Sequence, residues 1–194
     1  MPILQLEQNV FPENLLSGFT DEQEEAVTTN DSRSWWALFT MARREKSLAR
    51  QLVAQSVPFY LPLVAKDNRT RGGRRVRSYM PLFTGYVFLY GSASERIKAL
   101  TTNHISQTLP VLDHQQLVTD LRQVQQLIDS DSPLTIERRL MPGRCVRVTS
   151  GPLAGVEGTV TARRGKTRLL VDMHFLEAGV SVEIDDYLVE PMDY

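Results

Sequence analysis

Closely spaced glycines between residues 143 and 160 constrain the fold of this chain more than any other feature. Val146 and Val148 alternate with polar residues, as in a half-buried strand, and Val160 opens a second strand. Sharp turns and close strand contacts between them require glycine, which lacks a Cβ, and turn formers such as proline. The residues that meet this need are Gly151, Pro152, Gly155 and Gly158. The stretch therefore predicts two short strands folded sharply into a small β-barrel, in which these four residues are structural.

The sequence on both sides of this stretch also contains only short strand patterns. Strands are expected at 144–149, 157–162, 167–173, 179–184 and 187–190. Turn residues separate these segments at short intervals, which is typical of a five-stranded barrel. We predict a separate β-domain over residues 139–194.

The chain before this β-domain mixes strands and helices over residues 34–129. An aromatic strand begins at Trp35, and Pro62 in the second strand predicts either an edge position or a break in the ladder. Between them, the apolar spacing predicts a helix over residues 43–56, with Glu45 mostly on its outer face. This order of elements predicts an α+β domain.

Further signals complete the α+β domain. The most apolar strand is expected within residues 81–90, and Ser92 with Glu95 three residues later predicts a capping box. A last helix carries its apolar residues on one face, at Leu117, Leu121, Val124 and Ile128. We expect residues 130–138 to be a linker and the polar residues 1–33 to be an acidic, flexible extension.

Charge is segregated along the chain, although the formal net charge is only −1. Residues 1–33 carry seven acidic residues and one arginine, and residues 177–194 carry six acidic residues and no lysine or arginine. Residues 66–77 carry six basic residues and one aspartate around an expected hairpin turn at Gly72-Gly73. The pattern argues against nucleic-acid binding over the whole surface and favours a local cationic finger.

Residues that carry catalytic chemistry are sparse. The three histidines, His104, His114 and His174, are scattered without metal-ligand spacing, and no phosphate-binding glycine loop is present. Cys145 is the one cysteine, which excludes an internal disulfide framework, and its place within a strand predicts burial. We therefore expect no enzymatic activity, no cofactor and no bound metal.

Targeting signals also indicate a location. The chain begins without a leader pattern, and no apolar run approaches the ~18–20 residues of a membrane span. Together with the single cysteine, this predicts a soluble cytoplasmic protein without membrane contact.

Two motifs carry a family resemblance. The glycine-spaced stretch resembles the KOW motif, and Pro81-Leu-Phe-Thr-Gly-Tyr-Val-Phe88 is similar to the signature of the NGN domain of the NusG family. Trp35-Trp36 and Phe59-Tyr-Leu-Pro62 add to the resemblance, while Thr84 replaces the usual proline. The resemblance implies an NGN-type α/β sandwich with an antiparallel sheet, linked to a five-stranded SH3-like KOW barrel.

The resemblance implies a monomeric transcription elongation factor that binds RNA polymerase and suppresses pausing or termination. It also implies that the KOW domain recruits a ribosomal protein or the termination factor Rho, with the choice left open. The long extension favours a specialised antiterminator of the RfaH type over a general NusG, which remains the alternative. A KOW-type RNA- or ribosome-binding protein without polymerase contact is the rival interpretation.

The resemblance also implies which residues bind partners. An apolar patch for the polymerase is expected at Phe39, Tyr86 and Phe88, although core packing is the alternative for each aromatic. Contacts to upstream or non-template DNA are expected at Arg43, Arg44, Arg69, Arg71, Arg74, Arg75 and Arg77, unless this segment is only a solvated loop. The KOW partner is expected to contact Phe175 and Leu176.

Overall fold

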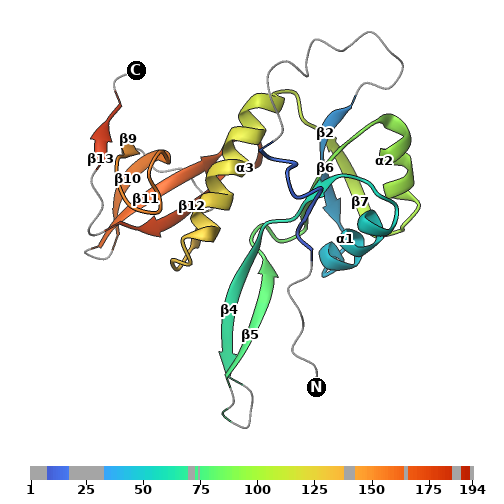
Figure 1. The fold of residues 1–194 in the computed structure, drawn as a ribbon, viewed down its shortest axis with the longest axis horizontal. Coiled ribbons are helices and arrows are strands. Elements are labelled where there is room, and N and C mark those ends of the chain that lie inside the picture. Colours follow the sequence, from blue (N-terminus) through green and yellow to red (C-terminus); the bar gives the residue numbers. More distant parts are fainter. Residues whose placement is uncertain are drawn as a thin grey trace. The chain divides into compact units, whose positions relative to one another are not determined.

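The computed structural model describes residues 8–17, 33–69, 73, 75–137, 143–163, 166–184 and 189–192 (Figure 1). The chain forms two compact units, Met1–His114 and Gln115–Tyr194. Antiparallel sheets and three α-helices make up the described residues, so the expectation of a mixed α/β fold is confirmed.

An antiparallel sheet of five strands forms the centre of the first unit, in the order β1-β3-β6-β2-β7. The strands are β1 (Val10–Phe11), β2 (Ser34–Thr40), β3 (Phe59–Tyr60), β6 (Tyr86–Gly91) and β7 (Ile105–Pro110). Because β6 is the third of the five, it has a strand on either side. The strand expected to be the most apolar is therefore the central strand of this sheet.

Two helices, α1 (Glu45–Ala54) and α2 (Ala93–Leu100), contact β6 and each other. Leu48 and Leu52 of α1 share a core with Leu38, Val87 and Leu89 of the sheet. The capping box of α2 is confirmed, since Ser92 Oγ accepts the Glu95 N–H and the Glu95 carboxylate accepts the Ser92 N–H. The apolar face of α1 and the capping box of α2 thus explain why these two helices form and pack on the sheet.

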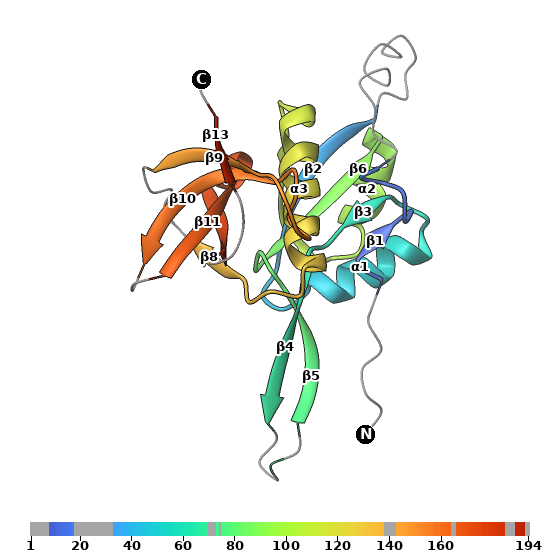
Figure 2. The ribbon, with the colours of Figure 1, turned by 60° about the vertical axis from the view of Figure 1, so that its left-hand side comes forward.

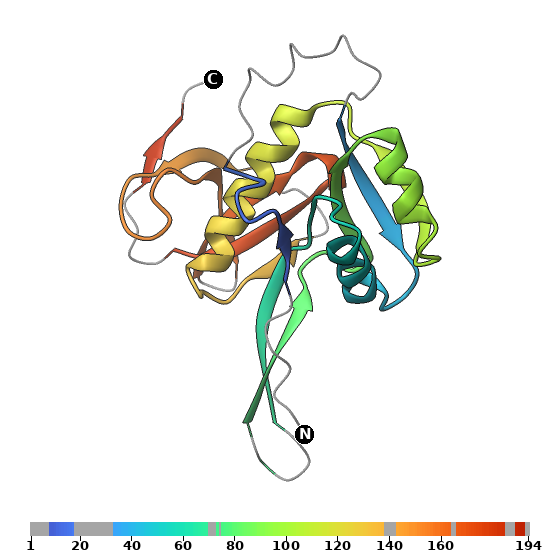
Figure 3. The ribbon, with the colours of Figure 1, turned by 45° about the vertical axis from the view of Figure 1, so that its right-hand side comes forward.

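A long hairpin leaves the first unit between β3 and β6. It consists of β4 (Leu63–Arg69) and β5 (Arg75–Pro81), with Arg69 opposite Arg75 in the register. Figures 2 and 3 show from two further sides that this hairpin projects away from the five-stranded sheet. The predicted hairpin is confirmed, as is the break at Pro62, one of the two predicted alternatives.

Part of the N-terminal extension is folded into the first unit. Val10 and Phe11 pair with β3, the Leu61 N–H donates to the Asn9 carbonyl, and Leu15 and Leu16 are buried. The expectation of a flexible extension is therefore wrong for residues 8–17. The physical reason is that β1 covers the free edge of β3, which would otherwise expose unpaired backbone groups.

The second unit contains α3 (His114–Asp129), except for His114, which belongs to the first unit. It also contains an antiparallel sheet in the order β13-β9-β10-β11-β12-β8. Five strands match the expected ones: β9 (Arg144–Val148), β10 (Glu157–Arg163), β11 (Lys166–Met173), β12 (Ala178–Glu183) and β13 (Val189–Pro191). The sixth, β8 (Thr135–Glu137), lies within the range expected to be a linker. The end strands β13 and β8 are not paired with each other in the part of the chain that the structure describes.

Arg168 helps to explain why β8 joins this sheet. Its guanidinium donates to the Thr135 hydroxyl of β8 and to the hydroxyl and carbonyl of Ser181 in β12. Ser181 Oγ in turn donates to Glu137 Oε1 at 2.9 Å. Side chains from two long strands thus hold three linker residues on the edge of β12.

Candidate functional site

A partly exposed aromatic pair lies at one end of the first unit's sheet. Phe39 of β2 and Tyr86 of β6 are opposite each other in the register, and their ring centroids are 5.2 Å apart. Phe39 remains 40% exposed, and Tyr86 is half-buried. We refer to these two residues as the aromatic pair.

Phe88 does not belong to this exposed surface. Its exposed fraction is 0%, and its neighbours in the ladder, Ala37 and Tyr60, are also fully buried. The prediction of an exposed patch of three aromatics is therefore wrong for Phe88. Alternation along β6 places Tyr86 and Phe88 on the same face, but the middle of this central strand is covered, and Tyr86 is partly exposed because it lies at the end.

The turn before Tyr86 is tied to the first turn of α1. The Gly85 N–H donates to Glu45 Oε1 at 2.8 Å, and the Gly85 carbonyl accepts the Thr40 N–H at 2.7 Å. Glu45 is 5% exposed, so its expected place on the outer face of the helix is wrong. The reason is that this carboxylate serves a backbone donor of another element instead of solvent.

Arg43 and Arg44 are both exposed, as a binding role requires, but neither lies within α1. Arg43 has a φ of 59°, which cannot continue a right-handed helix, and Arg44 is the N-cap residue. The helix therefore begins at Glu45, two residues later than predicted. An acidic residue opens the helix, which is favourable for its dipole.

The hairpin of β4 and β5 carries the other expected nucleic-acid contacts. Lys66 and Arg77 are exposed on it, and Asp67 faces Arg77 across the ladder. The side chains of Arg69 and Arg75, and the whole of Arg71 and Arg74, lie outside the described residues. The strand register thus places basic residues on both strands of a projecting element.

In the second unit, the expected partner-binding residues lie in a short 3-10 turn, η2 (His174–Leu176), between β11 and β12. Phe175 and Leu176 are both half-buried. Glu177 ends the turn with a left-handed backbone, at a φ of 49°. The turn is therefore a defined local structure that presents two apolar side chains.

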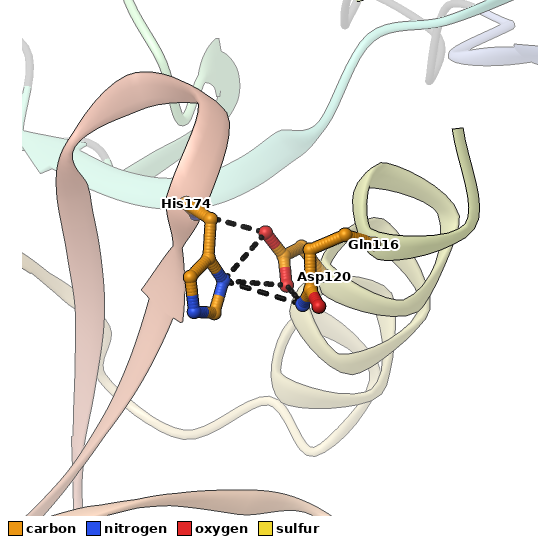
Figure 4. A network of polar contacts seen from close by, with 3 residues as sticks. All are labelled: Gln116, Asp120 and His174. Atoms are coloured by element: carbon orange, nitrogen blue, oxygen red, sulfur yellow. Dashed lines mark hydrogen bonds and ion pairs between the residues drawn. The ribbon is translucent and has the colours of Figure 1, made fainter. Parts of the chain in front are cut away.

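Asp120 of α3 holds this turn through a polar network (Figure 4). Its carboxylate accepts the His174 backbone N–H at 2.8 Å, and His174 Nδ1 lies 3.2 Å from each of its oxygens. Gln116 Nε2 donates to Asp120 Oδ1 at 2.8 Å. The network joins two successive turns of α3 to the start of η2.

Burial changes the proton affinity of two carboxyls beside His174. It raises the pKa of Asp120, and the hydrogen bonds from Gln116 and the His174 N–H offset part of the rise. Burial also raises the pKa of Asp172, where the charge of His174 acts in the opposite direction and that of Asp120 adds to the rise. Both carboxyls thus hold protons more tightly than they do in solvent.

The glycine-spaced stretch forms the turn that its pattern predicted. Gly151 and Gly155 have positive φ values of 80° and 87°, and Pro152 lies exposed between them. A Cβ on Gly158 would lie 2.3 Å from the Leu170 carbonyl oxygen of β11. Conformation at the first two glycines and space at the third support their predicted structural roles.

Two glutamines of α3 also contact this turn. Gln123 Oε1 accepts the Glu157 N–H at 2.7 Å, and Gln126 Nε2 donates to the carbonyls of Pro152 and Ala154 at 3.2 and 2.9 Å. The polar face of α3 therefore supports the backbone of the second unit at two places. This use of the helix was not predicted.

Some of these contacts had a signal in the sequence. Asp120 lies three residues after Leu117 and four before Val124, so a single charge interrupts the apolar face of α3. A charge in that position predicts a buried partner. Glu45 and the two glutamines gave no comparable signal, because acidic and amide residues are common on exposed helix faces.

Cys145 lies on the outer face of β9 and is exposed, so the prediction of its burial is wrong. The alternation of the strand turns Val146 and Val148 inward and Cys145 outward. Within the described residues, no group of three or more His, Cys, Asp and Glu side chains could hold a metal ion. None of the helices described is long and apolar enough to cross a membrane.

A sheet with an open aromatic end and a projecting basic hairpin is typical of proteins that bind other macromolecules. Comparison with protein-family models matches residues 33–142 to the family described as transcription termination factor NusG. The match covers more than half of the 194 residues, and the chain belongs to the NusG family. No curated protein matches the chain. The glycine-spaced stretch after residue 142 lies outside the matched range.

Proposed function

We propose that this protein is a transcription elongation factor that binds RNA polymerase and suppresses pausing or termination. Membership of the NusG family supports a role in transcription elongation or termination. The observation that carries the polymerase contact is the aromatic pair, Phe39 and Tyr86, at the partly exposed ends of two strands whose middle residues are buried.

The aromatic pair has the properties of a binding hot spot. Its rings contact each other, and its backbone is fixed by the sheet ladder and by the Gly85 carbonyl. Little conformational freedom is therefore lost on binding. Aromatic side chains dominate the energetics of many interfaces. By analogy with the family, the partner is an apolar helical face on the largest subunit of the polymerase.

The hairpin of β4 and β5 is proposed to contact upstream or non-template DNA. Arginine suits this task because its guanidinium forms paired hydrogen bonds with phosphate. We expect that replacing Arg75 and Arg77 with alanine reduces the salt dependence of binding to elongation complexes, by about 0.9 in the logarithmic slope for each lost phosphate contact. Titrations at several salt concentrations measure this slope, and an unchanged slope would argue against phosphate contacts.

The C-terminal part of the second unit is proposed to be a KOW domain whose sheet closes into an SH3-like barrel. In this proposal residues 34–129 form the NGN domain, and residues 130–138 connect it to the KOW domain at 139–194. Phe175 and Leu176 would then bind a ribosomal protein or Rho. We propose a monomeric, cytoplasmic, specialised antiterminator, a choice that rests on the N-terminal extension.

Affinity of the full chain for purified RNA polymerase tests the proposal. The variant F39A/Y86A removes the aromatic pair, and we expect it to bind about 30-fold more weakly, the loss typical of a hot spot. The matched control is I97A/L100A, which removes two exposed apolar side chains from α2 and should leave the affinity unchanged. Circular dichroism and thermal unfolding establish that both variants are folded.

Equal affinities of the two folded variants would contradict the proposed surface. Absence of polymerase binding by the wild-type chain, together with binding to structured RNA or ribosomes, would favour the rival interpretation of a KOW-type RNA- or ribosome-binding protein. The same purified proteins serve for both measurements.

A further inference from the structure

Glu45 is a buried acidic residue with a specific partner in another element. It opens α1, is 5% exposed, and its Oε1 accepts the Gly85 N–H at 2.8 Å. Burial of a carboxylate costs free energy unless the carboxylate is hydrogen-bonded. The contact with the Gly85 N–H offsets part of this cost for Glu45. The bond spans 40 residues of sequence.

The chain reaches this position by a tight reversal after β2. Arg43 has a φ of 59°, and the Arg44 N–H donates to the Met41 carbonyl at 3.1 Å. This reversal directs the first turn of α1 back toward the end of the strand that it has just left. Glu45 therefore lies beside the turn that leads into β6.

Gly85 has little freedom to move once these contacts are made. Its N–H donates to Glu45, its carbonyl accepts from Thr40, and its φ of 87° is one that other residues rarely adopt. A Cβ on Gly85 would lie 2.9 Å from Cε2 of Phe39, so the Phe39 ring packs directly on this glycine.

The aromatic pair is built on both sides of Gly85. Tyr86 follows it directly in the chain, and the Phe39 ring covers it. Ser106 Oγ donates to the Phe39 carbonyl at 3.0 Å from the other neighbouring strand, β7. A shift of Gly85 would therefore move both rings, while the rest of the sheet keeps its ladder.

We propose that Glu45 is the positioning residue of the polymerase-binding surface, acting through Gly85 on Phe39 and Tyr86. This inference rests on the proposed function, since it assigns the polymerase contact to the aromatic pair. Glu45 itself lies too deep to touch the polymerase. Its contribution is to hold the two rings in the arrangement that binds.

A second effect of Glu45 has to be separated from this one. An acidic residue in the first turn of a helix stabilises the helix through its dipole, whatever it contacts. E45D keeps this charge but shortens the side chain by one methylene and loses the reach to Gly85. E45Q loses the charge but keeps an amide oxygen at the same distance, so the two variants separate reach from charge.

The test compares wild type, E45D, E45Q and the control Q51A, an exposed change on the same helix, all in the full chain. We expect E45D to bind RNA polymerase about tenfold more weakly, because both rings must then be ordered on binding. E45Q and Q51A should stay close to wild type. Hydrogen exchange of the Gly85 amide gives a readout without polymerase, and it should be about tenfold faster in E45D alone.

Each outcome decides the assignment. Wild-type affinity and slow Gly85 exchange in E45D would overturn it, and a loss of affinity in E45Q alone would show that charge matters instead of reach. If the wild-type chain does not bind polymerase, the proposed function fails. The Gly85 exchange rates then still decide whether Glu45 positions the aromatic pair.

Discussion

The two regions proposed to bind proteins present aromatic side chains on different supports. The aromatic pair of Phe39 and Tyr86 rests on the ladder of its own sheet and on a glycine held by one carboxylate. Phe175 lies in a turn that Asp120 fastens through the backbone and ring of His174. The first surface should therefore respond to changes in packing, and the second to changes in charge.

The largest loss of stability is expected from a substitution in the buried part of the sheet that carries the aromatic pair. Phe88→Ala leaves a cavity in the centre of the sheet and should lower the free energy of unfolding by about 3–5 kcal/mol. Phe39→Ala, two ladder positions away on the same face, should cost less than about 1 kcal/mol because the ring is already partly exposed. Chemical denaturation of both variants measures the difference. Similar losses would mean that Phe39 is a core residue.

The next effect is expected in the network of the second region. Asp120→Ala leaves the His174 N–H without its acceptor and should destabilise the second unit by about 1–3 kcal/mol. Thr119→Ala, an exposed change on the same helix, is the control. Hydrogen exchange of residues 174–178 should report the loss locally. Unchanged protection of these residues would show that Asp120 does not stabilise the turn.

The smallest effect is a dependence of the second region's stability on pH. Asp120 and Asp172 have raised pKa values in the folded protein, so the folded state keeps their protons at a pH where the unfolded state has lost them. Their contribution to stability is complete below the unfolded pKa of about 3.9 and declines as the pH rises through the raised values.

The double variant D120N/D172N checks this dependence, because neither amide titrates. Unfolding of the second unit is followed by hydrogen exchange between about pH 4 and neutral pH, where the wild-type decline should exceed that of the variant. Equal pH profiles would place the proton uptake elsewhere in the unit.

The parts of the fold that local signals specify could be predicted from the sequence. The capping box of α2, the hairpin of β4 and β5 and the glycine turns before β10 each depend on residues close together in the chain. The strands β1 and β8 could not be predicted, because each has only two or three residues and gains its stability from a distant strand edge.

The candidate site was predictable in part for the same reason. Alternation identified the face of Tyr86 and Phe88, but the point along β6 where the covering side chains end depends on tertiary packing. Glu45 and Asp120 act through backbone groups 40 and 54 residues away, and such partners have no spacing to recognise. The sequence could thus indicate a candidate surface, but the side chains that hold this surface in place could be found only in the structure.

The central claim is that the aromatic pair contacts RNA polymerase, and a photo-crosslink tests it most directly. The full chain carries p-benzoylphenylalanine either at Phe39 or, as a control, at Ile97, which is exposed on α2. After binding to elongation complexes and irradiation, we expect position 39 to crosslink to the largest polymerase subunit and position 97 to give no such product. A bound chain that crosslinks from position 97 but not from position 39 would contradict the account.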